Sequence, residues 1–372
     1  MFSEIVERYD WDEVREEIYS KTQSDVENAI QNKNVSIEDF KALVSPAAEK
    51  YLEEMAFISR DITQKRFGKT MQLYIPLYLS NLCSNHCIYC GFNQNNKIHR
   101  IKLSDDEILA EVEVIKKMGY EHILLLTGES PKDTGLDYIA HAMDIIHPYF
   151  KQITLEVYPM TTAEYQHLIL HGLHGVYVYQ ETYHKKRYTH YHPAGKKRDY
   201  NWRINTPDRL GQAEVRKIGL GALLGLEDWR IEAVFMAMHL RYLEKKYWKV
   251  KYSIAFPRIR PHVGSFVPNF IVSDKEFAQM IWSFRMFDPD LEMSLTTRES
   301  QYFRNHMIDL GITSMSAGSK TDPGGYACYK NELEQFTVND NRNPVELMKM
   351  IQARGYETVW KDWDMCFEKE RN

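Results

Sequence analysis

The sequence predicts an α/β protein whose main domain is a closed (β/α)8 barrel of the TIM type. Eight short apolar stretches of strand length alternate with helical stretches between residues 71 and 320. Apolar strands that alternate with amphipathic helices are typical of a parallel sheet. Eight such units are the number that closes a barrel. We expect a helical N-terminal extension over residues 1–70 and a C-terminal cap segment over residues 321–372.

The extension is predicted to be helical from its start signals. Ser24 and Glu27 have the spacing of a capping box, and Ser36 can begin a second helix. Pro46 suits the first turn of a longer helix that ends near Phe67. No chemistry is evident in this region, so we expect it to pack on the barrel.

The barrel elements follow in order. The predicted strands are residues 73–79, 122–126, 153–157, 175–179, 218–224, 251–256, 292–295 and 313–317. Ser104 begins the first helix between them and Gly119 ends it, and further helices are predicted at about 136–147, 161–171, 206–216, 228–246, 274–286 and 299–309. The basic stretch 184–205 is expected to be a solvated loop. The cap segment contains a helix near 345–354 and the aromatic pair Trp360 and Trp363.

Composition limits the class of protein. The 372 residues carry a net charge of −5, which gives no global signature of nucleic-acid binding. The sequence has no apolar run of about 18 residues, so we expect no membrane span. Its N-terminus is charged and lacks an apolar signal core. Three of the five cysteines are bunched, which does not suggest disulfides, so we expect a cytoplasmic protein.

The bunched cysteines follow the first predicted strand. Cys83, Cys87 and Cys90 form a C-x3-C-x2-C array. Four thiolates would close a zinc site or a four-cysteine cluster, whereas three leave one position of a cubane without a protein ligand. The alternatives are a zinc site completed by His86 or His99, and buried thiols that act as small hydrophobic side chains.

This array, with an aromatic residue before its third cysteine, resembles the motif of the radical S-adenosylmethionine (SAM) superfamily. Tyr89 is that residue, and Gly91 and Phe92 follow the last cysteine as in many members. The resemblance implies a [4Fe-4S] cluster on the three cysteines and SAM chelated to the fourth iron. It also implies reductive cleavage of SAM to a 5′-deoxyadenosyl radical. We expect Tyr89 and Phe92 to lie at the cofactor.

Chemistry in such barrels sits at the C-terminal ends of the strands. Gly128 would let a ligand approach the backbone, and Glu129 resembles the family's contact to the SAM amino group. Glu181 is a candidate for the SAM ribose or amino group, and Gln180 for the substrate. Arg203 resembles the family arginine that binds the SAM carboxylate. The alternatives are a helix N-terminal acid and structural ion pairs with nearby arginines.

The ends of the later strands supply candidate residues for binding the substrate. Arg258 and Arg260 stand between two prolines after the sixth strand and project on one side of an extended segment, and Arg298 follows the seventh strand. A guanidinium offers a planar fork to a carboxylate, so Arg298 together with Ser314 or Ser316 of the eighth strand is expected to hold a substrate carboxylate. We therefore name Arg298, Ser316, Gln180 and Arg258 as candidate catalytic residues. The alternative for each arginine is a salt bridge of little energy.

Longer stretches resemble the tyrosine-cleaving branch of the superfamily, and within it the 2-iminoacetate synthase family of thiamine thiazole biosynthesis. They are residues 125–129, 156–160, 179–184, 192–196, 199–203, 256–261 and 316–325. A sister family that matures [FeFe]-hydrogenase has an additional C-terminal cluster domain with closely spaced cysteines. Here that region holds only Cys328 and Cys366, which we interpret as ordinary thiols.

The resemblance implies cleavage of the Cα–Cβ bond of L-tyrosine to 2-iminoacetate (dehydroglycine) and p-cresol. A flavodoxin- or ferredoxin-type protein is the implied reductant, and thiazole synthase is a hypothetical partner because dehydroglycine hydrolyses readily. Two alternatives stay open. One is a related radical SAM enzyme, such as a tryptophan lyase or a deazaflavin-forming enzyme, and the other is a zinc-binding protein without enzymatic activity.

Overall fold

Eight parallel strands form a closed barrel in the computed structural model of this chain, which describes residues 1–329 and 334–361. The strands from β2 to β8 follow one another around the sheet in chain order. β1 closes the ring by pairing with both β2 and β8. The predicted fold class is therefore confirmed. The barrel strands are β1 Thr70–Ser80, β2 His122–Thr127, β3 Gln152–Glu156, β4 Leu173–Tyr177, β5 Lys217–Gly221, β6 Lys251–Ala255, β7 Glu292–Leu295 and β8 Ser314–Ser316.

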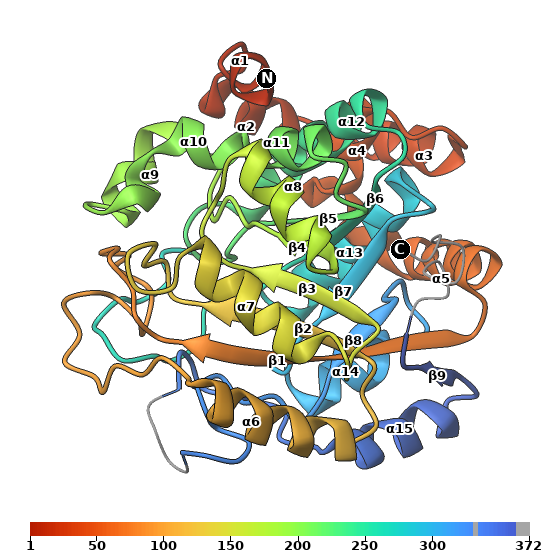
Figure 1. The fold of residues 1–372 in the computed structure, drawn as a ribbon. Helices are drawn as coiled ribbons and strands as arrows, with labels where there is room; N and C mark the ends of the chain where they lie inside the picture. The colour runs from red at the N-terminus through yellow and green to blue at the C-terminus, as the bar shows by residue number, and fades with distance from the viewer. Residues whose placement is uncertain (330–333, 362–372) are drawn as a thin grey trace.

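Helices cover the outside of this barrel (Figure 1). The predicted capping box at Ser104 is present, because its hydroxyl accepts from the Glu107 backbone N–H while the Glu107 carboxylate accepts from the Ser104 backbone N–H. α12 and α13 are buried along almost their whole length, since further helices pack on them. The outer helices are α6 Asp105–Lys117, α7 Leu136–Ile146, α8 Thr162–Leu170, α11 Thr206–Gln212, α12 Trp229–Lys246, α13 Asp274–Phe287 and α14 Gln301–Met307.

The N-terminal extension is the layer that covers α12 and α13. Phe40 packs against Phe284 and Phe287 of α13, with ring centroids 4.9 and 5.1 Å away. The capping box predicted at Ser24 is wrong, because Thr22 caps this helix with Asp25 as its partner. The extension comprises α1 Phe2–Val6, α2 Trp11–Tyr19, α3 Gln23–Gln31, α4 Ile37–Leu43, the 3-10 helix η1 Pro46–Tyr51 and α5 Leu52–Phe67.

The expectation of a solvated loop over residues 184–205 is also wrong. This stretch folds into α9 Lys185–Tyr191, the 3-10 turn η2 Lys196–Arg198 and α10 Tyr200–Ile204. Tyr188 and Tyr191 are completely buried, and so is His192. Most of the basic residues of this stretch are exposed, but Arg203 is buried and Lys197 is only partly exposed. The segment therefore packs on the barrel mouth as a wall.

The C-terminal segment has two parts. Its first part supplies Ser319, Thr321, Gln335 and Phe336 to the lining of the cavity described below. The chain then forms α15 Pro344–Ala353 and the short strand β9 Glu357–Val359, which pairs with the first residues of β1. Trp360 packs edge-on against Tyr120. Trp363 and Cys366 lie outside the described residues.

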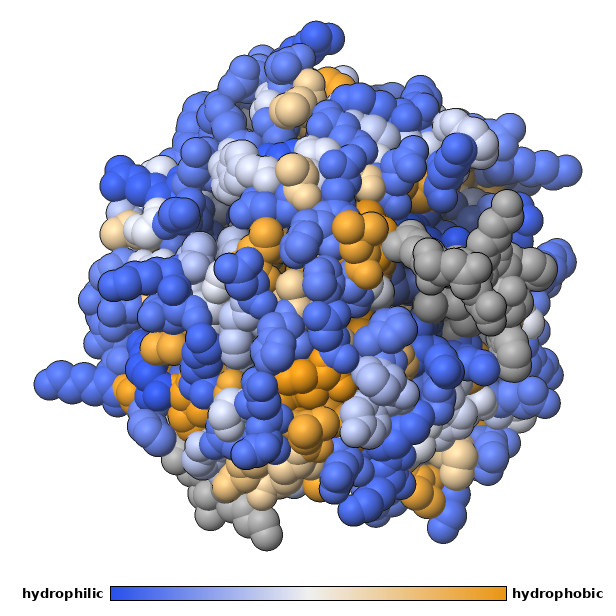
Figure 2. All heavy atoms as spheres, in the orientation of Figure 1, coloured by the Kyte–Doolittle hydropathy of each residue, from blue (hydrophilic) through white to orange (hydrophobic). Residues whose placement is uncertain are grey.

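The face seen in Figure 2 is mostly hydrophilic, and its hydrophobic residues lie in separate small groups. The helices of the described part of the chain include none that is long and apolar enough to cross a membrane.

Candidate active site

The long loops gather at the end of the barrel where β1 terminates (Figure 1), and a cavity opens there between the strand ends. All eight strands or the loops that follow them contribute to it. The β5 glycines make room for two tyrosines, since a Cβ at Gly219 would lie 2.0 Å from the Tyr177 ring and one at Gly221 2.5 Å from the Tyr179 ring. Chemistry-bearing residues that line the cavity are Cys83, Cys87, Cys90, Glu129, Glu156, Glu181, Lys197, Arg203, Arg260, Arg298 and Ser316.

The three bunched cysteines all face this cavity. Burial raises the pKa of the Cys83 thiol to about 11 and also raises the pKa of Cys87 and of Cys90, so a positive metal centre is needed to hold them as thiolates. In the described residues, no three His, Cys, Asp or Glu side chains converge on a single metal ion. A [4Fe-4S] cluster does not require such convergence, because each of its irons takes one thiolate. The arrangement fits a cluster held by Cys83, Cys87 and Cys90.

The cysteine loop is fixed by contacts to the wall formed by residues 184–205. The Tyr89 hydroxyl lies 2.7 Å from Nε2 of His192, and Nδ1 of His192 lies 2.8 Å from the Tyr188 carbonyl oxygen. Because Nδ1 donates to that carbonyl, Nε2 accepts from Tyr89. The His86 backbone N–H also donates to the Ala194 carbonyl. The loop thus depends on a segment about 100 residues later in the chain.

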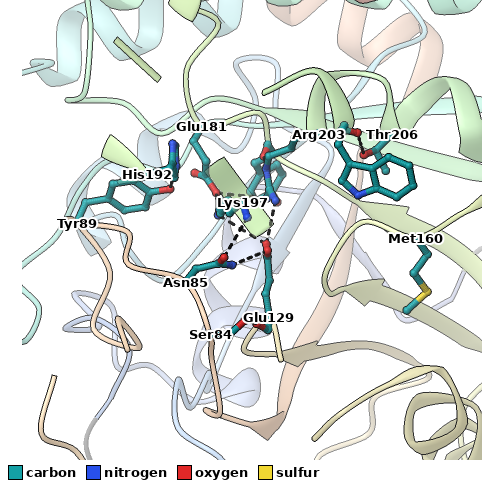
Figure 3. A network of polar contacts seen from close by, with 12 residues as sticks. Ser84, Asn85, Tyr89, Glu129, Met160, Glu181, His192, Lys197, Arg203 and Thr206 are labelled. Carbon is teal, nitrogen blue, oxygen red and sulfur yellow. Dashed lines mark hydrogen bonds and ion pairs between the residues drawn. The ribbon is translucent and has the colours of Figure 1, made fainter. Parts of the chain in front are cut away.

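Two acids and two cations form a buried network beside the cysteines (Figure 3). An Arg203 N–H donates to Oε1 of Glu129 at 2.9 Å, and the Lys197 ammonium donates to Oε1 of Glu181 at 2.7 Å. Cross pairs join the two halves, because Lys197 lies 3.8 Å from Glu129 and Arg203 lies 3.6 Å from Glu181. The Asn85 amide donates to the other Glu129 oxygen at 2.8 Å, which ties the network to the cysteine loop.

The network keeps its members charged in spite of burial. Burial alone would raise the pKa of Glu129, but Arg203 and Lys197 hold that pKa below its usual value. Burial would likewise lower the pKa of Lys197 and of Arg203, and the facing carboxylates raise both instead. The wall beside the cysteines therefore offers fixed charges of both signs, which suits a zwitterionic ligand.

Glu181 has a backbone conformation that side chains other than glycine rarely adopt. Its φ is +70°, in the left-handed region. The chain holds this conformation because the Leu223 N–H donates to the Glu181 carbonyl and Gln180 bonds to Gly221. The turn aims the Glu181 carboxylate at Lys197. Such strained residues cluster at ligand sites.

The opposite side of the cavity contains Arg298, Glu156 and Ser316. The Arg298 guanidinium lies 3.3 Å from the centroid of the Phe336 ring, and no described carboxylate forms an ion pair with it. Burial raises the pKa of Glu156 to about 7, and the neighbouring charge of Glu181 adds to this effect. The Ser316 hydroxyl accepts from the Thr297 backbone N–H at 3.2 Å. A buried cation is thus available to an anionic ligand.

The C-terminal segment closes the cavity near the cysteines. The Tyr78 hydroxyl donates to Oε1 of Gln335 at 2.8 Å, and the Gln335 amide lies 3.8 Å from Sγ of Cys90. A Cβ at Gly91 would lie 2.5 Å from the Gln335 carbonyl oxygen, so the two backbones can lie this close only because residue 91 is a glycine. The segment screens one side of the cysteine loop from solvent.

Two of the predicted site residues, Arg258 and Gln180, do not line the cavity, and a third, Gly128, lines it and also has a structural role. Arg258 does not line the cavity, because it pairs with Glu299 and with Asp274, whose Oδ1 lies 2.7 Å from it. The salt-bridge alternative is therefore the one that holds for Arg258. Gln180 is buried away from the cavity, and its amide has no hydrogen-bond partner in the described part of the chain. At Gly128 a Cβ would lie 2.2 Å from the Leu82 carbonyl oxygen, so this glycine first serves to seat the cysteine loop.

Sequence reasoning missed several cavity residues. Lys197 stands in a basic run that is predicted to be solvated, and only the buried aromatic residues at helical spacing around it indicate that it belongs to a packed wall. Asn85 lies inside the cysteine motif, where its amide gives no signal of its own. Arg260, which is predicted to project on the same side as Arg258 but is not among the named candidates, does line the cavity. Gln335 and Phe336 carry no sequence signal.

Comparison with protein families agrees with this geometry. Residues 77–237 match the model of the radical SAM superfamily, which covers the cysteine loop and the ionic network. Residues 255–357 match the model of the Biotin and Thiamin Synthesis associated domain, which covers the Arg298 side and the C-terminal segment. The fold and the site thus define a radical SAM enzyme, whose cofactors are a [4Fe-4S] cluster and SAM.

Similarity to individual proteins identifies the family within this superfamily. The chain is 46% identical to 2-iminoacetate synthase of Escherichia coli over 98% of its length and 97% of the relative's, and equally similar to the Salmonella typhimurium protein. The chain belongs to the 2-iminoacetate synthase family of the radical SAM superfamily. The crystal structure of HydG, a maturase of the [FeFe]-hydrogenase, superposes with a TM-score of 0.88 at 33% identity, covering 94% of this chain and 80% of HydG. Methylornithine synthase shares the fold, with a TM-score of 0.71 at 18% identity.

Proposed function

We propose that this protein cleaves the Cα–Cβ bond of L-tyrosine to give 2-iminoacetate and p-cresol, with 5′-deoxyadenosine and methionine as the other products. The observation that carries the proposal is the 46% identity to 2-iminoacetate synthases over 98% of the chain, together with a cavity that contains the three cysteines and Arg298. The cluster and SAM, when bound, supply a primary carbon radical that removes a hydrogen atom from the substrate. The zinc-binding alternative has no comparable support.

The ionic network is the proposed binding site for the amino acid group of SAM. Glu129 and Glu181 offer carboxylates to its ammonium group, and Arg203 and Lys197 offer cations to its carboxylate. These residues are already charged and held in place by one another, so little reorganisation accompanies binding. Tyr89 lines the same part of the cavity, and Phe92 packs behind it against Tyr78.

The other side of the cavity is the proposed substrate site. Arg298 faces the cavity as a buried cation that no described carboxylate pairs with, and the tyrosine carboxylate supplies the missing anion. Ser316 adds a hydroxyl beside it. The rings of Tyr177 and Tyr179 form an aromatic wall for the phenol side chain. Glu156, whose pKa of about 7 permits either protonation state, is available to hold or accept a proton of the amino group.

The chain also excludes water from the reaction. Residues 184–205 and the C-terminal segment cover the cavity from two sides, and both touch the cysteine loop. An open site would admit dioxygen and dissolved hydrogen donors such as thiols, which react with a carbon radical, so closure is part of the catalytic requirement. A cluster of low potential also needs a reducing compartment, which supports a cytoplasmic location.

Product analysis tests the proposal. The anaerobically reconstituted, reduced protein is incubated with SAM and either L-tyrosine or L-tryptophan, and p-cresol and glyoxylate, the hydrolysis product of 2-iminoacetate, are measured. We expect both products from tyrosine and no p-cresol or skatole from tryptophan. Cleavage of tryptophan, or SAM consumption without p-cresol, would favour the alternative of a related radical SAM enzyme.

A further inference from the structure

One of the three bunched cysteines borders both the cavity and a groove on the outside of the protein. Cys83 lines the inner cavity and also lines a separate groove on the outer side of the cysteine loop. Cys87 and Cys90, among the described residues, line only the inner cavity. An electron that enters from a protein partner crosses the least intervening protein at Cys83.

This outer groove is basic. Arg100, Lys132 and Lys196 line it, against a single acid, Asp133. Lys132 and Lys196 are exposed and take part in no ion pair within the described part of the chain. The Asp133 carboxylate accepts a hydrogen bond from the Ser130 hydroxyl at 2.5 Å and forms no ion pair with either lysine in the described part of the chain. A local positive patch on a chain of net charge −5 is a feature that steers an acidic partner to one place.

Arg100 makes the groove rigid as well as positive. Its guanidinium donates to four backbone carbonyls that belong to both ends of the cysteine loop, namely those of Asn81, Phe92, Asn93 and Asn96. The loop therefore keeps its shape when a partner docks on it. The groove is small and open, and basic side chains line it, which suits a small, transient electron-transfer contact better than a permanent interface.

We propose that the groove beside Cys83 is the docking surface for a small acidic one-electron carrier of the flavodoxin type. The anionic flavin hydroquinone of the carrier loses one electron and becomes the neutral semiquinone, and the cluster passes from its 2+ to its 1+ state, with no proton transferred. The proposal rests on the proposed function only in requiring a cluster on the three cysteines. It does not depend on the identity of the substrate.

Charge reversal at the two exposed lysines tests the surface. The holoprotein with Lys132→Glu and Lys196→Glu is compared with the unchanged chain for flavodoxin affinity by calorimetry, and for the rate of cluster reduction by flavodoxin hydroquinone in stopped flow. At low ionic strength we expect affinity and rate to fall by about tenfold, and the difference to shrink as salt is added. Reduction by dithionite, which needs no docking surface, stays unchanged.

A matched variant controls for the change in net charge. Lys33→Glu with Lys50→Glu reverses two exposed lysines of the N-terminal extension and should leave flavodoxin affinity unchanged. Equal effects of both double variants, or no effect of the groove variant, would overturn the proposal. Neither measurement uses tyrosine, so a protein that makes no p-cresol would leave this result readable, and a failed docking test would leave the lyase activity standing.

Discussion

An Arg203 N–H donates to a carboxylate oxygen of Glu129 at a distance of 2.9 Å, although the two residues are 74 positions apart in the chain. Both side chains are buried beside the cysteine loop, and each keeps the other charged. Arg203 also donates through Nε to the Tyr179 carbonyl. The pair thus joins the end of β2, the end of β4 and α10 at the proposed SAM site.

Arg203→Gln should weaken SAM binding by about tenfold, or about 1.4 kcal/mol, because it removes a cation offered to the SAM carboxylate. Without Arg203 the pKa of Glu129 should rise, so binding should also weaken in mildly acid solution as Glu129 takes up a proton. Equilibrium binding of SAM between pH 5 and pH 8 measures both effects. Arg198→Gln, at an exposed arginine nearby, is the control. Equal SAM affinity in the two variants would contradict the assignment.

Replacing any one of Cys83, Cys87 and Cys90 by alanine should prevent assembly of a complete cluster, because each thiolate is the single protein ligand of one iron. Iron and sulfide per chain after anaerobic reconstitution, with the visible absorption of the cluster, measure the loss. Cys328→Ala is the matched control, since this thiol lies outside the cavity near the Glu107 carbonyl. An intact cluster in any of the three variants would remove that cysteine from the proposed ligands.

Glu156 should make stability depend on pH. Burial raises its pKa from 4.5 to about 7, so between these values the folded chain holds a proton that the unfolded chain has released. This group therefore lowers the free energy of unfolding as the pH rises from about 4.5 to about 7, and Glu156→Gln removes that loss. The difference in Tm between the variant and the unchanged chain should grow in favour of the variant from pH 5 to pH 8. Parallel pH profiles would contradict the raised pKa.

Arg298 and Arg258 should respond differently to the same change. Arg298→Gln should raise the KM for tyrosine roughly 10- to 100-fold, because a charged hydrogen bond to the substrate carboxylate is lost. Arg258→Gln instead breaks the pairs with Glu299 and Asp274 and should lower Tm while leaving the KM of the folded fraction unchanged. Steady-state kinetics and thermal unfolding of both variants separate the two roles. A raised KM in Arg258→Gln alone would reverse the assignment.

The strands could be predicted because each is a short apolar run between helices. β7 has the predicted limits, and β1 extends the predicted run at both ends. The stretch 184–205 could not be predicted in the same way, because its charges dominate the local pattern. Its buried face includes Tyr191, whose hydroxyl donates to the Leu226 carbonyl, 35 residues later in the chain.

The residues of the candidate site also fall into those that a local sequence pattern predicts and those that depend on contacts between distant parts of the chain. Residues within motifs, such as Cys83 and Glu129, could be predicted because their type and spacing indicate their chemistry, and both line the same cavity in the structure. Arg258 and Arg260 are indistinguishable in sequence, and both pair with Glu299. Arg258 differs in its further bonds to Asp274 and to the Val272 carbonyl, which hold it away from the cavity. Gln335 reaches Cys90 across 245 residues, a contact that no local pattern specifies.

The central claim is that one cavity binds SAM at the cysteine loop and tyrosine at Arg298. A single anaerobic turnover with limiting SAM and excess L-tyrosine tests it most directly. We predict one p-cresol for each 5′-deoxyadenosine formed, and formation of both only when tyrosine, SAM and reductant are present together. Formation of 5′-deoxyadenosine at the same rate with and without tyrosine, and without p-cresol, would contradict the account.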